Sequence, residues 1–376
     1  MKLRYKILLG ILLLLVAGLG SLGLALSHDS ACTAAPVPPA GATLMKAIGY
    51  RCYGSPDVLR LTDTVRPTVA DDAILVKVHA AALNPLDWHF LQGTPYVFRL
   101  SVGIGAPKDP RLGVDFAGTV DAVGRNVTRV KPGDEVFGAS TGAFAEYVSV
   151  VADDALARKP GNLTFEQAAA VPIAGTTALQ ALRDKGHIAP GQKVLINGAS
   201  GGVGTFAVQI AKAFGAEVTG VCSTRNLQLV QSLGADHVID YTKEDFTRDG
   251  QRYDLILDNV GNLSLAQLWA LRRVLTPDGT VVIVGGGSAS ADPWIGPLSS
   301  PIKAMLLSKF VSQKFLMLFA DMKNADLATL GDLMQAGKLT PVIDRRYPLE
   351  ELPEAMRYLE LGHARGKVVI DTEPNH

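Results

Sequence analysis

A glycine-rich turn joins a short apolar stretch at 193–197 to a helix-like stretch at 203–214. The turn residues are Ser200, Gly201, Gly202, Val203 and Gly204. Glycines at these positions let the backbone turn tightly and let a pyrophosphate approach without meeting a Cβ atom. The N-terminus of the following helix adds unpaired N–H groups and the positive end of the helix dipole. The spacing therefore predicts a site for a dinucleotide cofactor.

The residues after the next expected strand, 217–222, indicate which dinucleotide binds. A site for NAD usually has Asp or Glu here, because a carboxylate binds the ribose hydroxyls. This chain has Ser223 and Arg225 instead, and a guanidinium beside hydroxyls can bind a 2′-phosphate through charge-assisted hydrogen bonds. We therefore expect NADP(H). In the alternative interpretation, Arg225 only begins the helix expected at 226–233 on its solvated side.

The composition limits the classes of protein that fit. The chain has 376 residues, of which 48% are hydrophobic, with 36 acidic and 36 basic side chains. This length and balance are typical of a two-domain α/β protein. A formal net charge of zero argues against a nucleic-acid partner, since binding a phosphate backbone requires a basic surface. Cys32, Cys52 and Cys222 are widely spaced and predict neither a disulfide framework nor a zinc site.

The first 26 residues differ from the rest of the chain. Three basic residues precede an unbroken apolar run at 7–26, which is long enough for a helix to cross a bilayer of roughly 30 Å. We expect a transmembrane anchor over residues 1–26, with a cleaved signal peptide as the alternative. The Pro- and Ala-rich residues within 27–44 predict a linker.

The basic residues before the apolar run would place the folded part outside the cytoplasm, because no further Lys or Arg follows until Lys46. Reduced NADP is a cytoplasmic metabolite. These two indications conflict, and the sequence leaves the side of the membrane open.

Two patterns of secondary structure divide the folded part. From 45 to 164, short strands separated by Gly and Pro predict a compact, partly barrel-like β domain. From 165 to 295, helices alternate with strands, which predicts a doubly wound parallel sheet with helices on both faces. The remaining residues, 296–376, are expected to hold helical segments within 294–319 and to return to the first domain through a strand at 366–370.

The expected elements can be placed by residue number. The strands of the first domain are 45–50, 73–82, 115–123, 134–137 and 144–150. The strands of the second are 193–197, 217–222, 237–240, 254–258 and 279–284, and its helices are 165–171, 177–185, 203–214, 226–233 and 263–274. Ligands of a doubly wound sheet bind at the carboxyl ends of its strands, and Val260 and Gly285 lie at such ends.

Further motifs accompany the glycine-rich turn. The turn sits in a longer pattern from Gly191 to Lys212, and the accompanying motifs are Asn84–Asp87, Gly113–Gly118, Lys131–Val136 and Gly234–Tyr241. On these motifs, residues 46–371 resemble the medium-chain dehydrogenase/reductase superfamily, in its zinc-free quinone oxidoreductase (ζ-crystallin-like) branch. The resemblance implies a GroES-like, partly barrel β domain beside a Rossmann-type parallel sheet.

The resemblance also makes two replacements informative. The zinc alcohol dehydrogenases of the superfamily have a Cys where Asn84 stands and a His where Val114 stands. Neither replacement can be a thiolate or imidazole ligand of Zn²⁺, and the four cysteines of the structural zinc lobe are missing. We therefore expect no metal. Lewis-acid activation of an alcohol is then unavailable, which favours reduction of a conjugated carbonyl.

Hydride transfer to a quinone or enone leaves negative charge on the carbonyl oxygen, which a hydrogen-bond or proton donor must stabilise. The branch commonly has an Asn, an Asp and an aromatic hydroxyl in the segment 84–89. Asn84 and Asp87 match that pattern, and His89 replaces the Tyr. An imidazole can protonate an oxygen near neutral pH, so the expected catalytic residues are Asn84, Asp87 and His89. The alternative for His89 is a structural histidine.

The resemblance implies three cofactor contacts outside the turn. Thr177 looks like the hydroxyl near the nicotinamide and phosphates, and Tyr241 looks like a wall of the adenosine or 2′-phosphate pocket. Lys367 is similar to a basic residue that reaches the cofactor from the C-terminal segment. Each has the alternative of a surface or packing residue.

The expected function is NADPH-dependent reduction of a quinone or an α,β-unsaturated carbonyl by a membrane-tethered homodimer. The apolar segment 297–319 would line the acceptor entrance, touch the bilayer or pack between subunits. Two other functions remain open. An enoyl-thioester reductase would share the fold and the hydride chemistry. A membrane-anchored NADPH-binding sensor without turnover would not need Asn84, Asp87 and His89.

Overall fold

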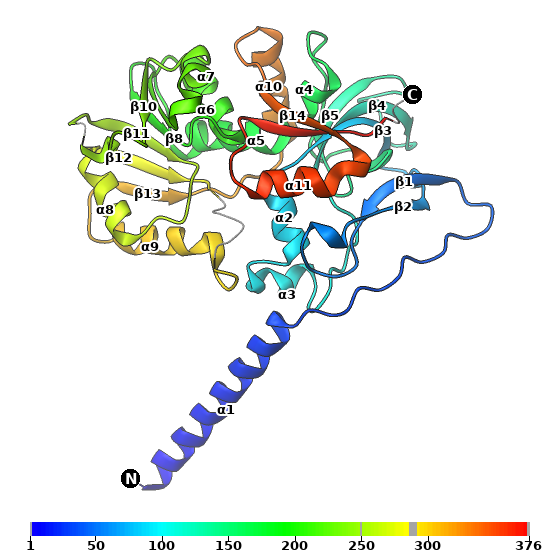
Figure 1. Cartoon of the computed structure of the whole chain (residues 1–376), viewed down its shortest axis with the longest axis horizontal. Coiled ribbons are helices and arrows are strands. Elements are labelled where there is room, and N and C mark those ends of the chain that lie inside the picture. The colour runs from blue at the N-terminus through cyan, green and yellow to red at the C-terminus, as the bar shows by residue number, and fades with distance from the viewer. Residues whose placement is uncertain (1, 249, 286–291, 374–376) are drawn as a thin grey trace.

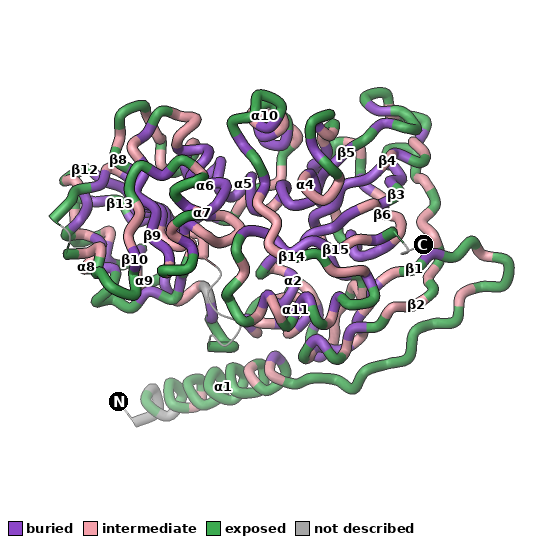
Figure 2. The backbone as a smooth tube through the Cα atoms, turned by 45° about the horizontal axis from the view of Figure 1, so that its top comes forward, coloured by how far each residue is buried: buried purple, intermediate pink, exposed green. Residues whose placement is uncertain are grey.

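The computed structural model describes residues 2–248, 250–285 and 292–373. Two large sheets lie side by side, and the N-terminal helix α1 (Lys2–Ser27) projects away from them (Figure 1). The strands of both sheets are largely buried, whereas α1 is exposed along most of its length (Figure 2).

The first of these sheets is parallel, with the strand order β10-β9-β8-β11-β12-β13. Its strands are β8 (Lys193–Asn197), β9 (Glu217–Cys222), β10 (His237–Asp240), β11 (Tyr253–Asp258), β12 (Leu275–Ile283) and β13 (Lys314–Met317). The chain winds outward in one direction from β8 and in the other from β11. This order confirms the doubly wound sheet, and it puts the expected ligand crevice at the carboxyl ends of β8 and β11.

Helices cover both faces of this sheet. They include α6 (Gly202–Ala213), α7 (Leu227–Ser232), α8 (Leu265–Arg273) and α9 (Ser299–Leu307). α5 (Pro172–Gln180) packs on α6, and α10 (Asn324–Gln335) packs on α5. α5 begins earlier than the helix expected at 177–185, because Pro172 suits a first helical turn, where its missing N–H costs no hydrogen bond. The expected helix continues as a π-helical turn over Ala181–Lys185.

The second sheet has the strand order β14-β15-β3-β4-β5-β7, with β6 paired to β3. Its strands are β3 (Ala73–Ala82), β4 (Asp115–Val123), β5 (Glu135–Ala139), β6 (Tyr147–Val151), β7 (Leu156–Arg158), β14 (Ile343–Pro348) and β15 (Lys367–Asp371). β15 is antiparallel to β3, with Val369 opposite Ala82. The C-terminal strand therefore returns to the first domain, as expected.

Smaller elements complete this half of the molecule. They are the hairpin β1 (Leu44–Gly49) and β2 (Arg60–Val65), the helices α2 (Pro85–Gln92), α3 (Arg99–Val102), α4 (Phe165–Ala169) and α11 (Leu352–Glu360), and the 3-10 turn η2 (Tyr96–Phe98). The carboxyl end of β3 leads directly into α2, and this junction contains Asn84.

Two boundaries differ from those expected. α9 confirms a helical segment within 294–319, but the same stretch also holds β13, whose pairing with β12 extends the parallel sheet beyond residue 295. Residues 315–319 form a continuous apolar run, and a short apolar run does not distinguish a buried strand from a helix. α4 packs against β3 and β4 although it lies beyond residue 164. The residues that form each sheet therefore do not follow the expected domain ranges 45–164 and 165–295.

The prediction that the cysteines form no disulfide was wrong. Cys32 and Cys52 are joined, with their Cα atoms 4.7 Å apart. The linker after α1 runs back along the β1–β2 hairpin (Figure 1), so two cysteines that are 20 residues apart meet. Spacing alone could not show this path. Cys222 is free and buried.

The end of α1 is held by Arg99, whose side chain is 1% exposed. Its Nη1 donates to the carbonyl oxygens of Leu26 (2.9 Å) and His28 (3.1 Å), and it pairs with Asp29 at 2.8 Å. The last carbonyl groups of a helix have no partner within the helix. Arg99 supplies that partner, so α1 joins the folded part through a buried contact. Over Ile7–Ser27 α1 is long and apolar enough to cross a membrane, and a signal sequence passes the same test.

Candidate functional site

The glycine-rich turn has the geometry that its sequence predicts. Gly201 precedes α6 in an extended conformation, and Gly198 has a left-handed φ of 77°. A Cβ atom at Gly204 would lie 2.1 Å from the carbonyl oxygen of Gly198. Only glycine allows α6 to start this close to the end of β8.

A pyrophosphate fits this turn. A Cβ atom at Gly201 would find its nearest neighbour, the oxygen of Gly198, at 3.5 Å, so the backbone is open to a ligand there. The first N–H groups of α6 have no acceptor within the helix and can donate to phosphate oxygens. The turn also lies at the carboxyl end of β8, where the winding of the sheet reverses.

The C-terminal strand binds the turn to the second sheet. Gly366 N–H donates to the carbonyl oxygen of Ser200 at 2.9 Å, and Gly366 forms a parallel bridge with Gly201. A Cβ atom at Gly202 would lie 3.3 Å from Cδ of Lys367. The predicted cofactor turn and the start of β15 are therefore in direct contact.

Lys367 continues from this contact into a buried cluster. Its Nζ donates to Asn84 Oδ1 (2.6 Å) and to the carbonyl oxygen of Leu83 (2.8 Å), and it lies 3.4 Å from Asp115 Oδ2. Asn84 Nδ2 donates to the same Asp115 oxygen at 2.9 Å. The other Asp115 oxygen accepts from the N–H of Ile173, next to the start of α5, at 3.0 Å. The cluster thus joins β3, β4, β15 and α5.

Asp87 completes the cluster at the first turn of α2. Its Oδ2 accepts from Asn84 N–H at 2.7 Å. Burial raises the pKa of Asp87 to about 7, with the hydrogen bond from Asn84 N–H opposing this shift. Burial also lowers the pKa of Lys367, against the charge of Asp115. With Asp87 protonated, the cluster holds one cation and one anion, which is the balance that a buried site requires.

Of the other predicted catalytic and nicotinamide residues, His89 and Thr177 lie on helices next to this cluster. His89 is half-buried in α2, with its ring centroid 5.7 Å from that of Trp88. Thr177 is 9% exposed in α5, and its hydroxyl donates to the carbonyl oxygen of Ile173 at 2.7 Å. Ile173 thereby contacts both Thr177 and Asp115.

The predicted 2′-phosphate residues lie beyond the carboxyl end of β9. Ser223 is half-buried and Arg225 is exposed. The Arg225 guanidinium donates to the carbonyl oxygen of His363 at 2.7 Å. Asn226, which the sequence reasoning missed, donates from Nδ2 to Ser200 Oγ (2.9 Å) and Ser223 Oγ (3.2 Å). This amide joins the glycine-rich turn to the predicted phosphate residues.

A carboxylate near this position also escaped the sequence reasoning. Asp240, at the end of β10, accepts hydrogen bonds from the hydroxyls of Thr224 (2.5 Å) and Thr242 (2.7 Å). The hydrogen bond from Thr224 is the main cause that lowers the pKa of Asp240, to about 2. Its negative charge is therefore satisfied internally. Tyr241 follows it with 60% of its surface exposed.

The ends of β11 and β12 form the other wall of the crevice. Asp258 is buried, and it accepts from Asn197 Nδ2 (2.7 Å) and Gly261 N–H (3.0 Å), which holds the loop after β11. Val260 stays 54% exposed in that loop. A Cβ atom at Gly285 would lie 2.6 Å from the nitrogen of Gly261, so the backbone there has no room for a side chain.

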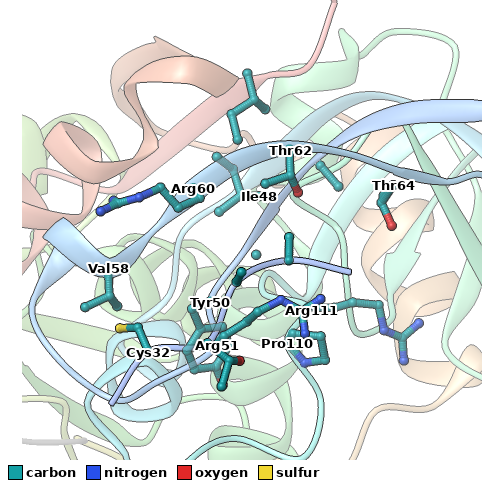
Figure 3. A pocket seen from close by; sticks show the side chains of 16 residues that line it. Cys32, Ile48, Tyr50, Arg51, Val58, Arg60, Thr62, Thr64, Pro110 and Arg111 are labelled. Carbon is teal, nitrogen blue, oxygen red and sulfur yellow. The ribbon is translucent and has the colours of Figure 1, made fainter. Parts of the chain in front are cut away.

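A separate cavity of about 370 Å³ lies under the β1–β2 hairpin (Figure 3). It is lined in part by Cys32, Tyr50 and Arg111. None of the predicted site residues lines it, so it is distinct from the crevice. Among the described residues no group of three or more His, Cys, Asp or Glu side chains could hold a metal ion.

Two family models match this chain. The model described as an alcohol dehydrogenase GroES-like domain matches residues 70–161, and the model described as a zinc-binding dehydrogenase matches residues 233–370. Together they cover parts of both large sheets.

Known proteins are similar to nearly the whole chain. The mitochondrial NAD(P)H oxidoreductase RTN4IP1 of Mus musculus is 33% identical over 94% of this chain and 100% of its own length. The chloroplastic NADPH-dependent alkenal/one oxidoreductase of Arabidopsis thaliana is 35% identical over 87% of this chain and 79% of its own length. The solved structure of the quinone oxidoreductase from Coxiella burnetii has a TM-score of 0.77 and 32% identity, covering 88% of this chain and 100% of that one.

Proposed function

Because the chain belongs to the medium-chain dehydrogenase/reductase superfamily, in its zinc-free quinone oxidoreductase branch, we propose that it is an NADP(H)-dependent reductase of quinones or α,β-unsaturated carbonyl compounds. The observation that carries the proposal is the contact between two sites. Gly366 and Lys367 join the glycine-rich turn to the buried cluster around Asn84. A cofactor on the turn and a substrate beside α2 would therefore meet.

NADPH supplies the hydride, and the chain's own residues hold both partners in place. The turn at Ser200–Gly204 would bind the pyrophosphate. Ser223 and Arg225 would bind the 2′-phosphate, with Tyr241 beside it, and Arg225 keeps guanidinium nitrogens beyond the one that donates to His363. Thr177 in α5, and Val260 and Gly285 in the loops after β11 and β12, would line the crevice towards the nicotinamide.

The three predicted catalytic residues divide into two roles. Asn84 and Asp87 are 2% and 0% exposed, and their polar atoms bind Lys367, Asp115 and each other. They would act as positioning residues that fix the start of α2. His89 is half-buried in the same helix, and it would donate the hydrogen bond or proton to the substrate oxygen.

This chemistry needs no metal. Asn84 and Val114 stand where the zinc enzymes of the superfamily have Cys and His. In this structure Asn84 is occupied with hydrogen bonds to Lys367 and Asp115. We therefore propose that a hydrogen-bond donor, rather than Zn²⁺, stabilises the oxygen that receives negative charge.

Loss of NADPH absorbance tests the proposal. The full chain would be assayed with NADPH and with NADH, against a panel of quinones and enones, in EDTA. Turnover that prefers NADPH and survives the chelator supports the proposal. Cofactor binding without reduction of any acceptor favours a sensor. Activity that requires Zn²⁺ and a simple alcohol contradicts the proposed zinc-free reductase.

We further propose that α1 stays in the mature protein as a membrane anchor, with the folded part on the non-cytoplasmic side. Disulfides persist in oxidising compartments, and the Cys32–Cys52 bond agrees with the basic residues before α1. Reduced cofactor would then have to be available on that side. Differential labelling tests this placement. Free thiols would first be alkylated in intact cells, the disulfides would then be reduced, and the newly freed thiols would receive a second label. Cys32 and Cys52 should take only the second label.

A homodimer through the edge of the parallel sheet completes the proposal. β13 is the last strand on its side of the sheet, and Phe310, just before it, is 82% exposed. An edge strand with apolar neighbours can pair with the same strand of a second copy. Light scattering of the detergent-solubilised protein would give twice the chain mass if this is right.

A further inference from the structure

Six exposed apolar side chains surround the point where α1 meets the folded part. Between 36% and 53% of the surface of each is accessible. We call this set the apolar collar; it consists of Val97, Phe98, Leu100, Ile104, Trp294 and Ile295. Four of them come from η2, α3 and the loop after α3, and two come from the segment before α9.

Direct contacts hold the two halves of the collar together and against α1. Tyr96 N–H donates to the carbonyl oxygen of Pro293 at 2.7 Å, and the rings of Tyr96 and Trp294 meet edge to face with centroids 5.2 Å apart. A Cβ atom at Gly23 would lie 3.4 Å from the Trp294 ring. Trp294 therefore touches α1 one turn before the helix ends.

The 93–107 part of the collar has no exposed charged side chain, whereas two exposed carboxylates lie beside it: Asp292, which accepts from Trp294 N–H, and Asp29, which pairs with Arg99. Residues 93–107 contain a single charged residue, Arg99. Its guanidinium is buried, where it binds the last carbonyl groups of α1 and stacks on Tyr53 and Tyr96 at 4.3 and 4.6 Å. The 93–107 segment could therefore enter the interface without a charged side chain losing its hydration, while Asp29 and Asp292 would stay hydrated among the lipid headgroups.

We propose that the apolar collar lies in the interface of the bilayer that α1 spans, and that this face of the enzyme rests on lipid. The proposal depends on the proposed anchor function of α1. The apolar run of α1 continues to Leu26, which is itself 6% exposed against the folded part. No free linker separates the span from the collar, so the bilayer surface must lie at the collar.

The side chains of the collar suit that position. Trp and Tyr are enriched at the boundary between hydrocarbon and water, and the Trp294–Tyr96 pair lies there. The aliphatic members would exchange water for lipid, which stabilises the contact. The same chain segment follows α2 directly, so a lipid-soluble acceptor would reach α2 from the bilayer rather than from water.

Site-specific quenching tests this contact in the full-length protein. Leu100 and Val151 are matched in exposure, at 52% and 53%. Leu100 belongs to the collar, whereas Val151 lies on β6 of the second sheet. Leu100→Cys and Val151→Cys would each be labelled with bimane and reconstituted into vesicles that contain brominated phospholipids. We expect the label at position 100 to lose at least half of its fluorescence, and the label at position 151 to keep it.

Three other outcomes would overturn the proposal in different ways. A protein that floats with the vesicles but shows no quenching at position 100 has an anchor without a collar contact. A protein that does not float lacks the anchor, and with it the collar contact. Cross-linking between two copies of the Leu100→Cys variant, without quenching, assigns this face to a dimer. In each case NADPH oxidation with a water-soluble quinone reports separately on the proposed enzyme function.

Discussion

Lys367 Nζ lies 2.6 Å from Asn84 Oδ1 and ties the first residue of β15 to the residue before α2. These two residues are far apart in sequence and come from the two ends of the folded part. Their contact places the glycine-rich turn and α2, the proposed cofactor-binding and catalytic elements, on either side of one lysine side chain.

Replacing Lys367 should destabilise the fold as well as impair turnover. In Lys367→Met the carboxylate of Asp115 stays buried without its cation, and breaking a buried pair in this way typically costs about 3–5 kcal/mol. Thermal unfolding would measure this loss. Lys338→Met, at an exposed lysine, is the matched control, and adding Asp115→Asn should recover part of the stability.

The stability of the protein should fall as the pH rises through the pKa of Asp87. The folded pKa is raised from 3.8 to about 7, so the folded state keeps a proton that the unfolded state loses. The contribution is complete below the unfolded pKa and is lost by about pH 7; at 1.36 kcal/mol per pKa unit it reaches roughly 4 kcal/mol. Because pH 5 already lies above the unfolded pKa, urea unfolding at about pH 5 and about pH 8 should differ by roughly 3 kcal/mol, which is about two pKa units at 1.36 kcal/mol each. Asp87→Asn should remove it, and an unchanged pH dependence would contradict the assignment.

Two alanine substitutions in the turn should separate folding from cofactor binding. Gly204→Ala puts a methyl group 2.1 Å from the oxygen of Gly198, and it should unfold the turn. Gly201→Ala meets nothing closer than 3.5 Å, so the fold should survive, whereas NADPH binding should weaken at least tenfold because the methyl group takes the place of the pyrophosphate. Calorimetric titration would measure the affinity of each variant for NADPH, and thermal unfolding would measure the stability of its fold. Equal NADPH affinity in Gly201→Ala and the parent protein would place the pyrophosphate elsewhere.

Arg225 should determine the preference for NADPH over NADH. A charge-assisted hydrogen bond contributes about 1.5–3 kcal/mol, so Arg225→Gln should raise KM for NADPH tenfold or more and leave KM for NADH nearly unchanged. Arg248→Gln, at another exposed arginine, serves as the control. If KM rises equally for NADPH and for NADH, Arg225 acts only through its contact with His363.

The order of elements could be predicted from the sequence, and several strands, such as β3, β8 and β9, have the expected bounds. These strands are long or regular enough to show a period, and the glycine-rich turn has a strict spacing. β13 shows no such period, because it belongs to the continuous apolar run at 315–319, which also suits a helix. The Cys32–Cys52 bond escaped prediction because it depends on how the linker runs along the domain, which spacing does not encode.

The sequence predicted individual residues of the candidate site but not the hydrogen bonds between them. Asp115 stood within a recognised motif, yet the sequence did not show that it accepts hydrogen bonds from Asn84 and Lys367. The one signal for Asp115 is a carboxylate at the start of a strand, directly before Phe116 and Ala117, since such a group is buried only with partners. Asn226 gave no signal, because its role depends on the distance between two loops.

The bridge between Gly366 and the turn also sets an order of assembly during synthesis. α1 and the strands β1–β7 leave the ribosome first, the parallel sheet with its turn follows, and β14 and β15 come after it. The carbonyl oxygen of Ser200 receives its partner only when residue 366 has emerged, after the whole parallel sheet. A nascent chain can therefore have its N-terminal helix in place while the glycine-rich turn still lacks its partner, and β15, made after the parallel sheet, supplies the contact that completes the proposed binding site.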